Sequence, residues 1–280
     1  MPKKVGIIGC GTIGTELGLA IDNGKIENAM IEAVYDKFDD AVKLLRSKLE
    51  KNTPSVFSDP NQFFFSRSFQ SLDVIVEAAS QEALRELAQK IIESGKILIA
   101  MSVGGLADPV FFSQLLSSLS LNHSSKIYLP TGAIAGIDAI RAVRDVLESV
   151  TLVTTKNPKA LIGAPFFRIT GLDVSAIVER TLIYEGSAAD AVKKFPANVN
   201  VAAILGLAGL GAEKTNVQIV ADPTIDVNRH EIIAKGSFGE MNITVHNRTS
   251  PRNAKTSFLA VLSAIECLRS VCNDSIHIGT

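Results

Sequence analysis

The sequence has no tryptophan, only three cysteines and no run of basic residues. The cysteines, at positions 10, 267 and 272, match neither a disulfide framework nor the spacing of a zinc site. A net charge of −1 without a lysine and arginine tract argues against nucleic acid or an anionic membrane surface as a partner. Hydrophobic residues make up 46% of the chain, which is enough for a sizeable core.

Long hydrophobic runs are also missing. The most apolar stretch, residues 199–212, is too short to cross a bilayer and is interrupted by glycines and an asparagine. The N-terminal residues 1–4 lead directly into a strand-like segment, which leaves no room for a signal peptide. We therefore expect a soluble cytoplasmic protein, not bound to membranes, whose 280 residues form one large or two modest domains.

A glycine-rich turn between a short apolar strand and a helical pattern stands at the start of the chain. Residues 5–14 read VGIIGCGTIG, which contains the pattern G-x-G-x-x-G. The first glycine permits a tight turn, the second lets the backbone approach a pyrophosphate, and the third allows close packing of helix on sheet. The first helical residues offer free N–H groups to phosphates. The predicted cofactor-binding residues here are Gly9, Gly11, Thr12, Ile13 and Gly14.

A second apolar strand, residues 30–34, ends in Tyr35 and Asp36. Asp36 lies at the spacing where a carboxylate receives the adenosine ribose hydroxyls of a dinucleotide. Its charge favours NAD by repelling a 2′-phosphate, although the adjacent Lys37 could partly accommodate one. We therefore predict NAD as cofactor, with NADP possible.

Apolar strand-like runs alternate with helical patterns from Asp36 to about residue 130. The expected strands are residues 72–79, 97–101 and 126–129, and the expected helices are 80–95 and 108–119. This alternation predicts an α/β fold with a doubly wound parallel sheet, that is, a Rossmann domain. The polar, phenylalanine-containing segment 52–68 has no pattern that we can assign.

The pattern changes after Pro130. An apolar helix is expected at residues 200–210 and a further helix at 251–271, among strand-like segments at 150–155, 183–185, 218–221, 229–235 and 240–247. We expect residues 1–130 to form the dinucleotide-binding domain, completed by the C-terminal helix within 251–280. Residues 131–250 are expected to form an α+β domain for substrate binding and oligomerisation. An open sheet with one uncovered face predicts a homodimer.

Two features of the second half can carry chemistry. His230 is the one histidine of four that lies in ordered, half-apolar sequence, although a structural role is equally open. Asn198 and Asn200 stand at the start of the apolar helix. Either can be a helix cap, and the pair could instead present amide groups to a carboxamide or carboxylate.

Five segments together resemble the L-aspartate dehydrogenase family, in order over nearly the whole chain. They are the glycine loop, MSVGGLAD at 101–108, GAIAGID at 132–138, FPANVNVA at 195–202 and the strand around His230. The resemblance implies oxidation of L-aspartate with NAD or NADP to iminoaspartate. The imine would hydrolyse to oxaloacetate and ammonia, or feed quinolinate and NAD biosynthesis. The resemblance also implies that His230 is catalytic and that Ala133 and Asn200 contact the nicotinamide end. We expect no metal site.

The implied chemistry suits these residue types. An imidazole with a pKa near neutrality can accept the proton that the substrate amine loses as the C=N bond forms. The two carboxylates of the substrate need cationic or N–H partners. Lys156, Arg168 and Arg229 are candidates that the sequence does not rank.

Other dehydrogenases with a Rossmann domain and an open-sheet domain are the alternatives. A dihydrodipicolinate reductase would carry paired histidines, and no His-His occurs. An aspartate-semialdehyde dehydrogenase needs a cysteine nucleophile, and none lies between Cys10 and Cys267. A homoserine dehydrogenase would use a lysine pair, and Lys193 and Lys194 lack its neighbouring pattern. A non-catalytic NAD-binding regulatory protein would need no chemistry at His230.

Overall fold

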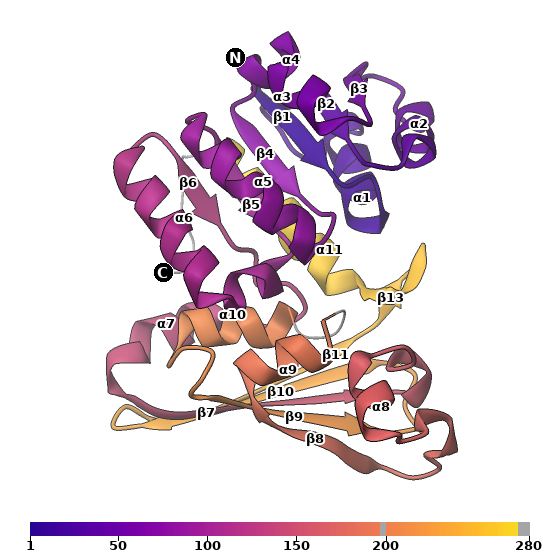
Figure 1. The fold of residues 1–280 in the computed structure, drawn as a ribbon, viewed down its shortest axis with the longest axis vertical. Coiled ribbons are helices and arrows are strands. Elements are labelled where there is room, and N and C mark those ends of the chain that lie inside the picture. The colour runs from indigo at the N-terminus through magenta and orange to yellow at the C-terminus, as the bar shows by residue number, and fades with distance from the viewer. Residues whose placement is uncertain (197–199, 274–280) are drawn as a thin grey trace. The chain divides into compact units, whose positions relative to one another are not determined.

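The computed structural model describes residues 1–196 and 200–273 (Figure 1). The chain divides into two compact units. Unit 1 comprises Met1–Pro130 and the C-terminal segment from Val261, and unit 2 comprises Thr131–Ala260. Asn198 lies outside the described residues. None of the described helices combines the length and the apolar character needed to cross a bilayer.

Unit 1 is built on a parallel sheet of six strands in the order β3-β2-β1-β4-β5-β6. This is the strand order of a doubly wound dinucleotide-binding fold, so the predicted Rossmann architecture is confirmed. The strands are β1 (Lys3–Ile8), β2 (Ala29–Tyr35), β3 (Ser55–Phe57), β4 (Val74–Glu77), β5 (Ile97–Ala100) and β6 (Lys126–Tyr128).

The helices of unit 1 bury the apolar stripes that their spacing predicts. In α5 (Gln81–Glu93), Leu84, Leu87 and Ile91 are buried, and the Ser80 hydroxyl caps the helix by accepting from the Ala83 N–H at 3.1 Å. The remaining helices are α1 (Thr12–Asp22), α2 (Asp39–Ser47), α3 (Pro60–Phe65), α4 (Arg67–Ser71), the short 3₁₀ helix η1 (Val103–Ala107) and α6 (Pro109–Leu121).

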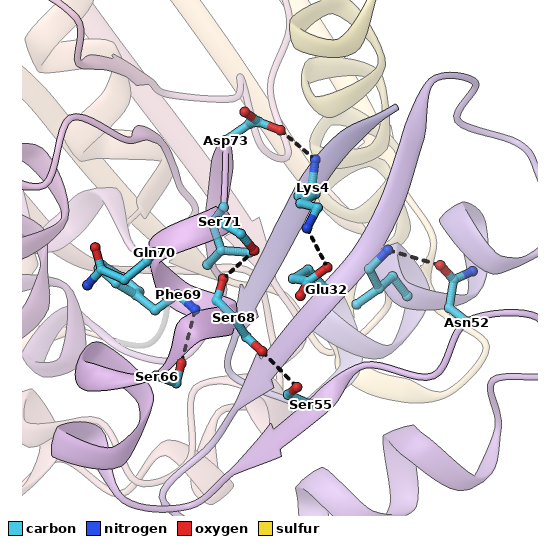
Figure 2. Close-up of polar contacts among 12 residues, drawn as sticks. Lys4, Glu32, Asn52, Ser55, Ser66, Ser68, Phe69, Gln70, Ser71 and Asp73 are labelled. Carbon is cyan, nitrogen blue, oxygen red and sulfur yellow. Dashed lines mark hydrogen bonds and ion pairs between the residues drawn. The ribbon is translucent and has the colours of Figure 1, made fainter. Parts of the chain in front are cut away.

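The unassigned segment 52–68 supplies the edge strand β3 and most of the two short helices α3 and α4. Figure 2 shows how this part of the chain is tied to the sheet. The Asn52 side chain accepts from the Ile31 N–H at 3.0 Å, and the Ser55 and Ser68 hydroxyls lie 2.8 Å apart. Phe63 and Phe69 are fully buried beside β2, which explains the aromatic content of the segment.

The last described helix, α11 (Phe258–Cys272), places Ala264, Leu268 and Val271 in the core of unit 1. The prediction that this helix begins at Pro251 is wrong. Asn253–Ser257 forms strand β13, which pairs with β12 (Thr249–Ser250) in a hairpin turned at Pro251 and Arg252. Strand pairing satisfies the backbone groups that the predicted first helical turns would have used.

Unit 2 contains a mixed sheet of five strands in the order β11-β10-β7-β9-β8. Only β7 and β9 are parallel to each other; the other described pairs of this sheet are antiparallel. The strands are β7 (Leu147–Lys156), β8 (Thr181–Ser187), β9 (Thr215–Ala221), β10 (Asn228–Gly236) and β11 (Gly239–Asn247). The α+β open sheet predicted for this part of the chain is confirmed.

One face of this sheet is covered and the other is open. Within unit 2, α9 (Ala188–Lys194) and α10 (Asn200–Ala208) lie over the covered face (Figure 1). Along β10, His230, Ile232 and Ala234 are buried, whereas the residues between them are partly exposed. The other helices of unit 2 are α7 (Ile137–Val143) and α8 (Pro165–Thr170), with 3₁₀ helices η2 (Arg144–Val146), η3 (Pro158–Ala160) and η4 (Val174–Ala176).

Candidate functional site

A cavity of about 540 Å³ in unit 1 opens at the carboxyl ends of β1, β2 and β4. Its volume is within the range of small-molecule and cofactor sites. It is lined by the glycine loop, by Asp36–Phe38 after β2, and by Ala78–Ser80 after β4, together with Ala83, Glu86 and Leu87 of α5. In a doubly wound sheet this is the edge where ligands bind.

Two of the three loop glycines are required by the backbone packing around the loop, independently of any ligand. Gly9 has φ of +90°, and a Cβ there would lie 2.6 Å from the carbonyl carbon of Ala78 and from the nitrogen of Ala79. A Cβ on Gly14 would overlap the carbonyl oxygen of Gly9. Gly11 differs, because a Cβ there would meet no atom within 4 Å. The space over Gly11 suits a pyrophosphate, so the loop fits a dinucleotide.

Asp36 lies beside the glycine loop, as the sequence predicted, but its carboxylate has a further role. One oxygen accepts from the Cys10 N–H at 2.8 Å and the other from the Phe38 N–H at 2.9 Å. The side chain is partly exposed and lines the cavity together with Gly9 and Gly11. Thr12, Ile13 and Gly14 form the first turn of α1 and do not line this cavity.

Sequence analysis missed Glu77, the last residue of β4. Its carboxylate is fully buried and accepts four hydrogen bonds, from the N–H groups of Ala79, Ser80 and Ser102 and from the Ser102 hydroxyl, at 2.8–3.1 Å. Burial raises the pKa of this carboxyl, and these hydrogen bonds oppose the shift. Glu77 thereby fixes the turn that contacts Gly9 and lines the cavity. An acidic residue at the end of an apolar strand was the available signal.

In unit 2, four buried polar residues share the covered face at one end of the sheet. They are Thr154, Lys156, His230 and Asn247, here called the polar cluster. The register sets them together, because Thr154 pairs with His230 across β7 and β10, and Asn228 pairs with Asn247 across β10 and β11. Residues further along the same face, such as Leu152 and Ile232, are apolar.

His230 is only 3% exposed, and its Nδ1 lies 3.1 Å from the Thr154 hydroxyl. Burial, followed by the charge of Lys156, lowers the pKa of this imidazole from 6.5 to about 3. The expected near-neutral pKa is therefore wrong for this structure. The imidazole is uncharged at neutral pH, which is the form that accepts a proton.

The structure separates the three cationic candidates. Lys156, 8% exposed, belongs to the polar cluster, and burial lowers the pKa of its ammonium group to about 8. Arg229 points to the opposite face of the sheet and pairs with Glu231 at 2.7 Å. Arg168 is exposed on α8.

Ala133 and Asn200 also belong to unit 2. The Ala133 carbonyl accepts from the Asn247 side chain at 2.7 Å, which ties the loop before α7 to the polar cluster. Asn247 was missed, since nothing local distinguishes it. Asn200 is the exposed first residue of α10. Gly9, Gly11, Thr12, Ile13, Gly14 and Asp36 all belong to unit 1. Over the described ranges, no group of three or more His, Cys, Asp or Glu side chains could hold a metal ion.

In comparisons with known proteins, two family models match successive parts of the chain. Residues 9–130 match the family model for the NAD-binding domain of homoserine dehydrogenase, and residues 138–271 match that for the C-terminal domain of aspartate dehydrogenase. The homoserine dehydrogenase model covers only the dinucleotide-binding part, whereas the rest of the chain matches aspartate dehydrogenase.

Full-length similarity is found with L-aspartate dehydrogenases. The enzyme of Nitrosopumilus maritimus is 45% identical over 99% of this chain and 100% of its own. That of Methanosarcina barkeri is 42% identical over 99% of both chains. The crystal structure of aspartate dehydrogenase from Thermotoga maritima aligns over 100% of both chains, with a TM-score of 0.75 and 29% identity.

More distant structures share the fold alone. The scyllo-inositol dehydrogenase of Lactobacillus casei, solved with NAD(H), aligns with a TM-score of 0.60 at 14% identity over 100% of this chain and 92% of its own. The glycine loop, the buried histidine and the similarity along the entire chain lead to one conclusion: this chain belongs to the L-aspartate dehydrogenase family.

Proposed function

We propose that the chain oxidises L-aspartate with NAD or NADP to iminoaspartate, with His230 as the acid–base group. The observation that supports this best is the uncharged, buried imidazole of His230, hydrogen-bonded to Thr154 within the polar cluster. Hydrolysis of the imine yields oxaloacetate and ammonia, and iminoaspartate can also feed quinolinate and NAD biosynthesis.

When bound, the dinucleotide supplies the acceptor for the hydride that leaves Cα of the substrate. Gly9, Gly11 and Asp36 would hold its adenosine and pyrophosphate part, and the N-terminal turn of α1 with Thr12, Ile13 and Gly14 would face the phosphates. Ala133 and Asn200 are proposed to position the nicotinamide end.

His230 would take the proton that the substrate amine loses as the C=N bond forms. Nδ1 faces Thr154, so Nε2 would accept this proton in the tautomer that carries its hydrogen on Nδ1. The low pKa makes the imidazole a weak base before substrate binds. Substrate carboxylates nearby would favour the charged imidazolium and raise its pKa.

The test is reduction of NAD and NADP by L-aspartate, L-glutamate, L-alanine and L-homoserine, in the wild type and in His230→Ala. We expect selective turnover of aspartate and a kcat lower by about 10²–10⁴-fold in the variant. The dissociation constant of NAD should change little, because the glycine loop is in the other unit. Turnover of homoserine, or a fully active His230→Ala enzyme, would contradict the proposal.

We also propose a homodimer formed through the open face of the unit 2 sheet. On this face Val153 and Ile233 are partly exposed, so some apolar surface is accessible there to a partner. Light scattering should give twice the chain mass for the wild type and a shift toward monomer for Ile233→Arg. A cytoplasmic location is proposed because Cys10 and Cys267 are free thiols, as a reducing compartment would keep them.

A further inference from the structure

Lys156 is the one lysine of the polar cluster, and it ends β7 two residues after Thr154. Residues two apart in a strand point to the same face, so the Lys156 side chain extends on the side of the sheet that carries His230. Because Thr154 is paired with His230, Lys156, two positions further along β7, is a diagonal neighbour of His230. Diagonal neighbours on one face are about 7–8 Å apart, a distance that a lysine side chain and a small dicarboxylate together can span.

The burial of this ammonium group is costly, since charge is poorly stabilised away from water. Its pKa falls to about 8 for that reason, and its positive charge in turn lowers the pKa of His230. An anion entering this end of the sheet would be attracted by Lys156 in a medium of low dielectric constant, where the attraction is stronger than at the surface.

We infer that Lys156 is a substrate-binding residue whose ammonium group pairs with a carboxylate of L-aspartate while His230 acts on the amine. The inference rests on the proposed function. It follows from the location of the cation, because Arg229 is on the opposite face and Arg168 is exposed on α8. The pairing also has a chemical consequence: the carboxylate would offset the charge that disfavours protonation of His230.

Lys156→Met tests the inference, because methionine retains the apolar stem and removes the charge. Lys156→Arg retains the charge. Lys214→Met is the matched control, since Lys214 is an exposed lysine of the same unit, in the turn before β9. Each protein is assayed for aspartate-dependent reduction of NAD. Binding of succinate, a dicarboxylate without the amine, is measured by calorimetry in the presence of NAD.

We expect Lys156→Met to raise the KM for aspartate and the dissociation constant of succinate by about 10–100-fold, the effect of losing one charge-assisted hydrogen bond. Its affinity for NAD and its melting temperature should be retained. Lys156→Arg should recover part of the affinity, and Lys214→Met should match the wild type.

An unchanged KM and succinate affinity in Lys156→Met would overturn the inference and leave the proposed function intact, provided that the wild type oxidises aspartate. Equal losses in Lys156→Met and Lys214→Met would overturn it as well, because they would show a non-specific effect of charge. If Lys156→Met does not fold, the comparison is made with Lys156→Gln, and the same outcomes apply. A wild type inactive toward aspartate would refute the proposed function itself.

Discussion

The Thr154 hydroxyl lies 3.1 Å from Nδ1 of His230, across two paired strands and within a buried face. The bond links the orientation of the imidazole to the register of β7 and β10. For Nε2 to accept a proton, Nδ1 must carry the hydrogen of the neutral ring and donate it to Thr154. A hydroxyl can donate or accept, so Thr154 fixes the position of the ring and is compatible with this tautomer.

Replacing Thr154 by valine should lower kcat without a comparable change in the KM for NAD. A neutral hydrogen bond is worth about 0.5–1.5 kcal/mol, so a loss of up to about tenfold is expected. Thr154→Ser, which keeps the hydroxyl, is the control and should stay close to the wild type. Steady-state kinetics with aspartate as the varied substrate measures both. Equal activity of the valine and serine variants would show that the hydroxyl does not orient His230.

His230 should also make the protein less stable in acid. Its pKa is about 3 in the folded chain and 6.5 in an unfolded one, so between these values the unfolded state binds the extra proton. Stability is therefore lost as the pH falls from 6.5 toward 3, by at most about 1.4 kcal/mol per pH unit. His230→Gln should lose less stability than the wild type over this window. The measurement is the unfolding free energy of both proteins at several pH values, and parallel curves would contradict the buried neutral imidazole.

Asp36→Asn should change the choice of cofactor. The amide retains an acceptor for one of the two backbone N–H groups and removes the charge that opposes a 2′-phosphate. We expect a higher KM for NAD and a smaller preference for NAD over NADP, by about tenfold in the ratio of kcat/KM values. Lys37→Met, at the adjacent position, should affect NADP more than NAD. If the ratio of kcat/KM for NAD to that for NADP is unchanged in Asp36→Asn, the carboxylate only accepts the two backbone hydrogen bonds and does not contact the cofactor.

Glu77→Gln should weaken both the fold and cofactor binding. Glutamine offers one acceptor oxygen to a site with four donors, and its NH₂ group would face N–H groups. Leaving a buried donor unpaired costs about 1–3 kcal/mol. The expected result is a lower melting temperature and a weaker affinity for NAD with the KM for aspartate less affected. Glu93→Gln, at the exposed end of α5 and outside the lining of this cavity, serves as the control.

The glycine loop, the alternation of strands and helices and the position of His230 could be predicted because each depends on residues close together in the sequence. The sequence could not predict that Lys156 is a better candidate than Arg229 for binding a substrate carboxylate, since this depends on which face of the sheet each side chain occupies. That is fixed by the pairing of β7 with β10, across more than seventy positions of sequence. The pKa of His230 escaped prediction for the same reason. Residues 253–257 were predicted as helix, although they form β13, because β12, the strand that pairs with them, has only two residues and leaves no sequence pattern.

The return of α11 to unit 1 has a consequence for synthesis of the chain. Ala264, Leu268 and Val271 complete a core that also contains Val5, Ile7 and Leu17. The residues of β1 and α1 are synthesised first, and those of α11 are synthesised last. The core of unit 1 therefore remains incomplete until α11 has been synthesised, whereas residues 131–260 can fold earlier. Nascent chains that stop before α11 should expose apolar surface and be targets for chaperones.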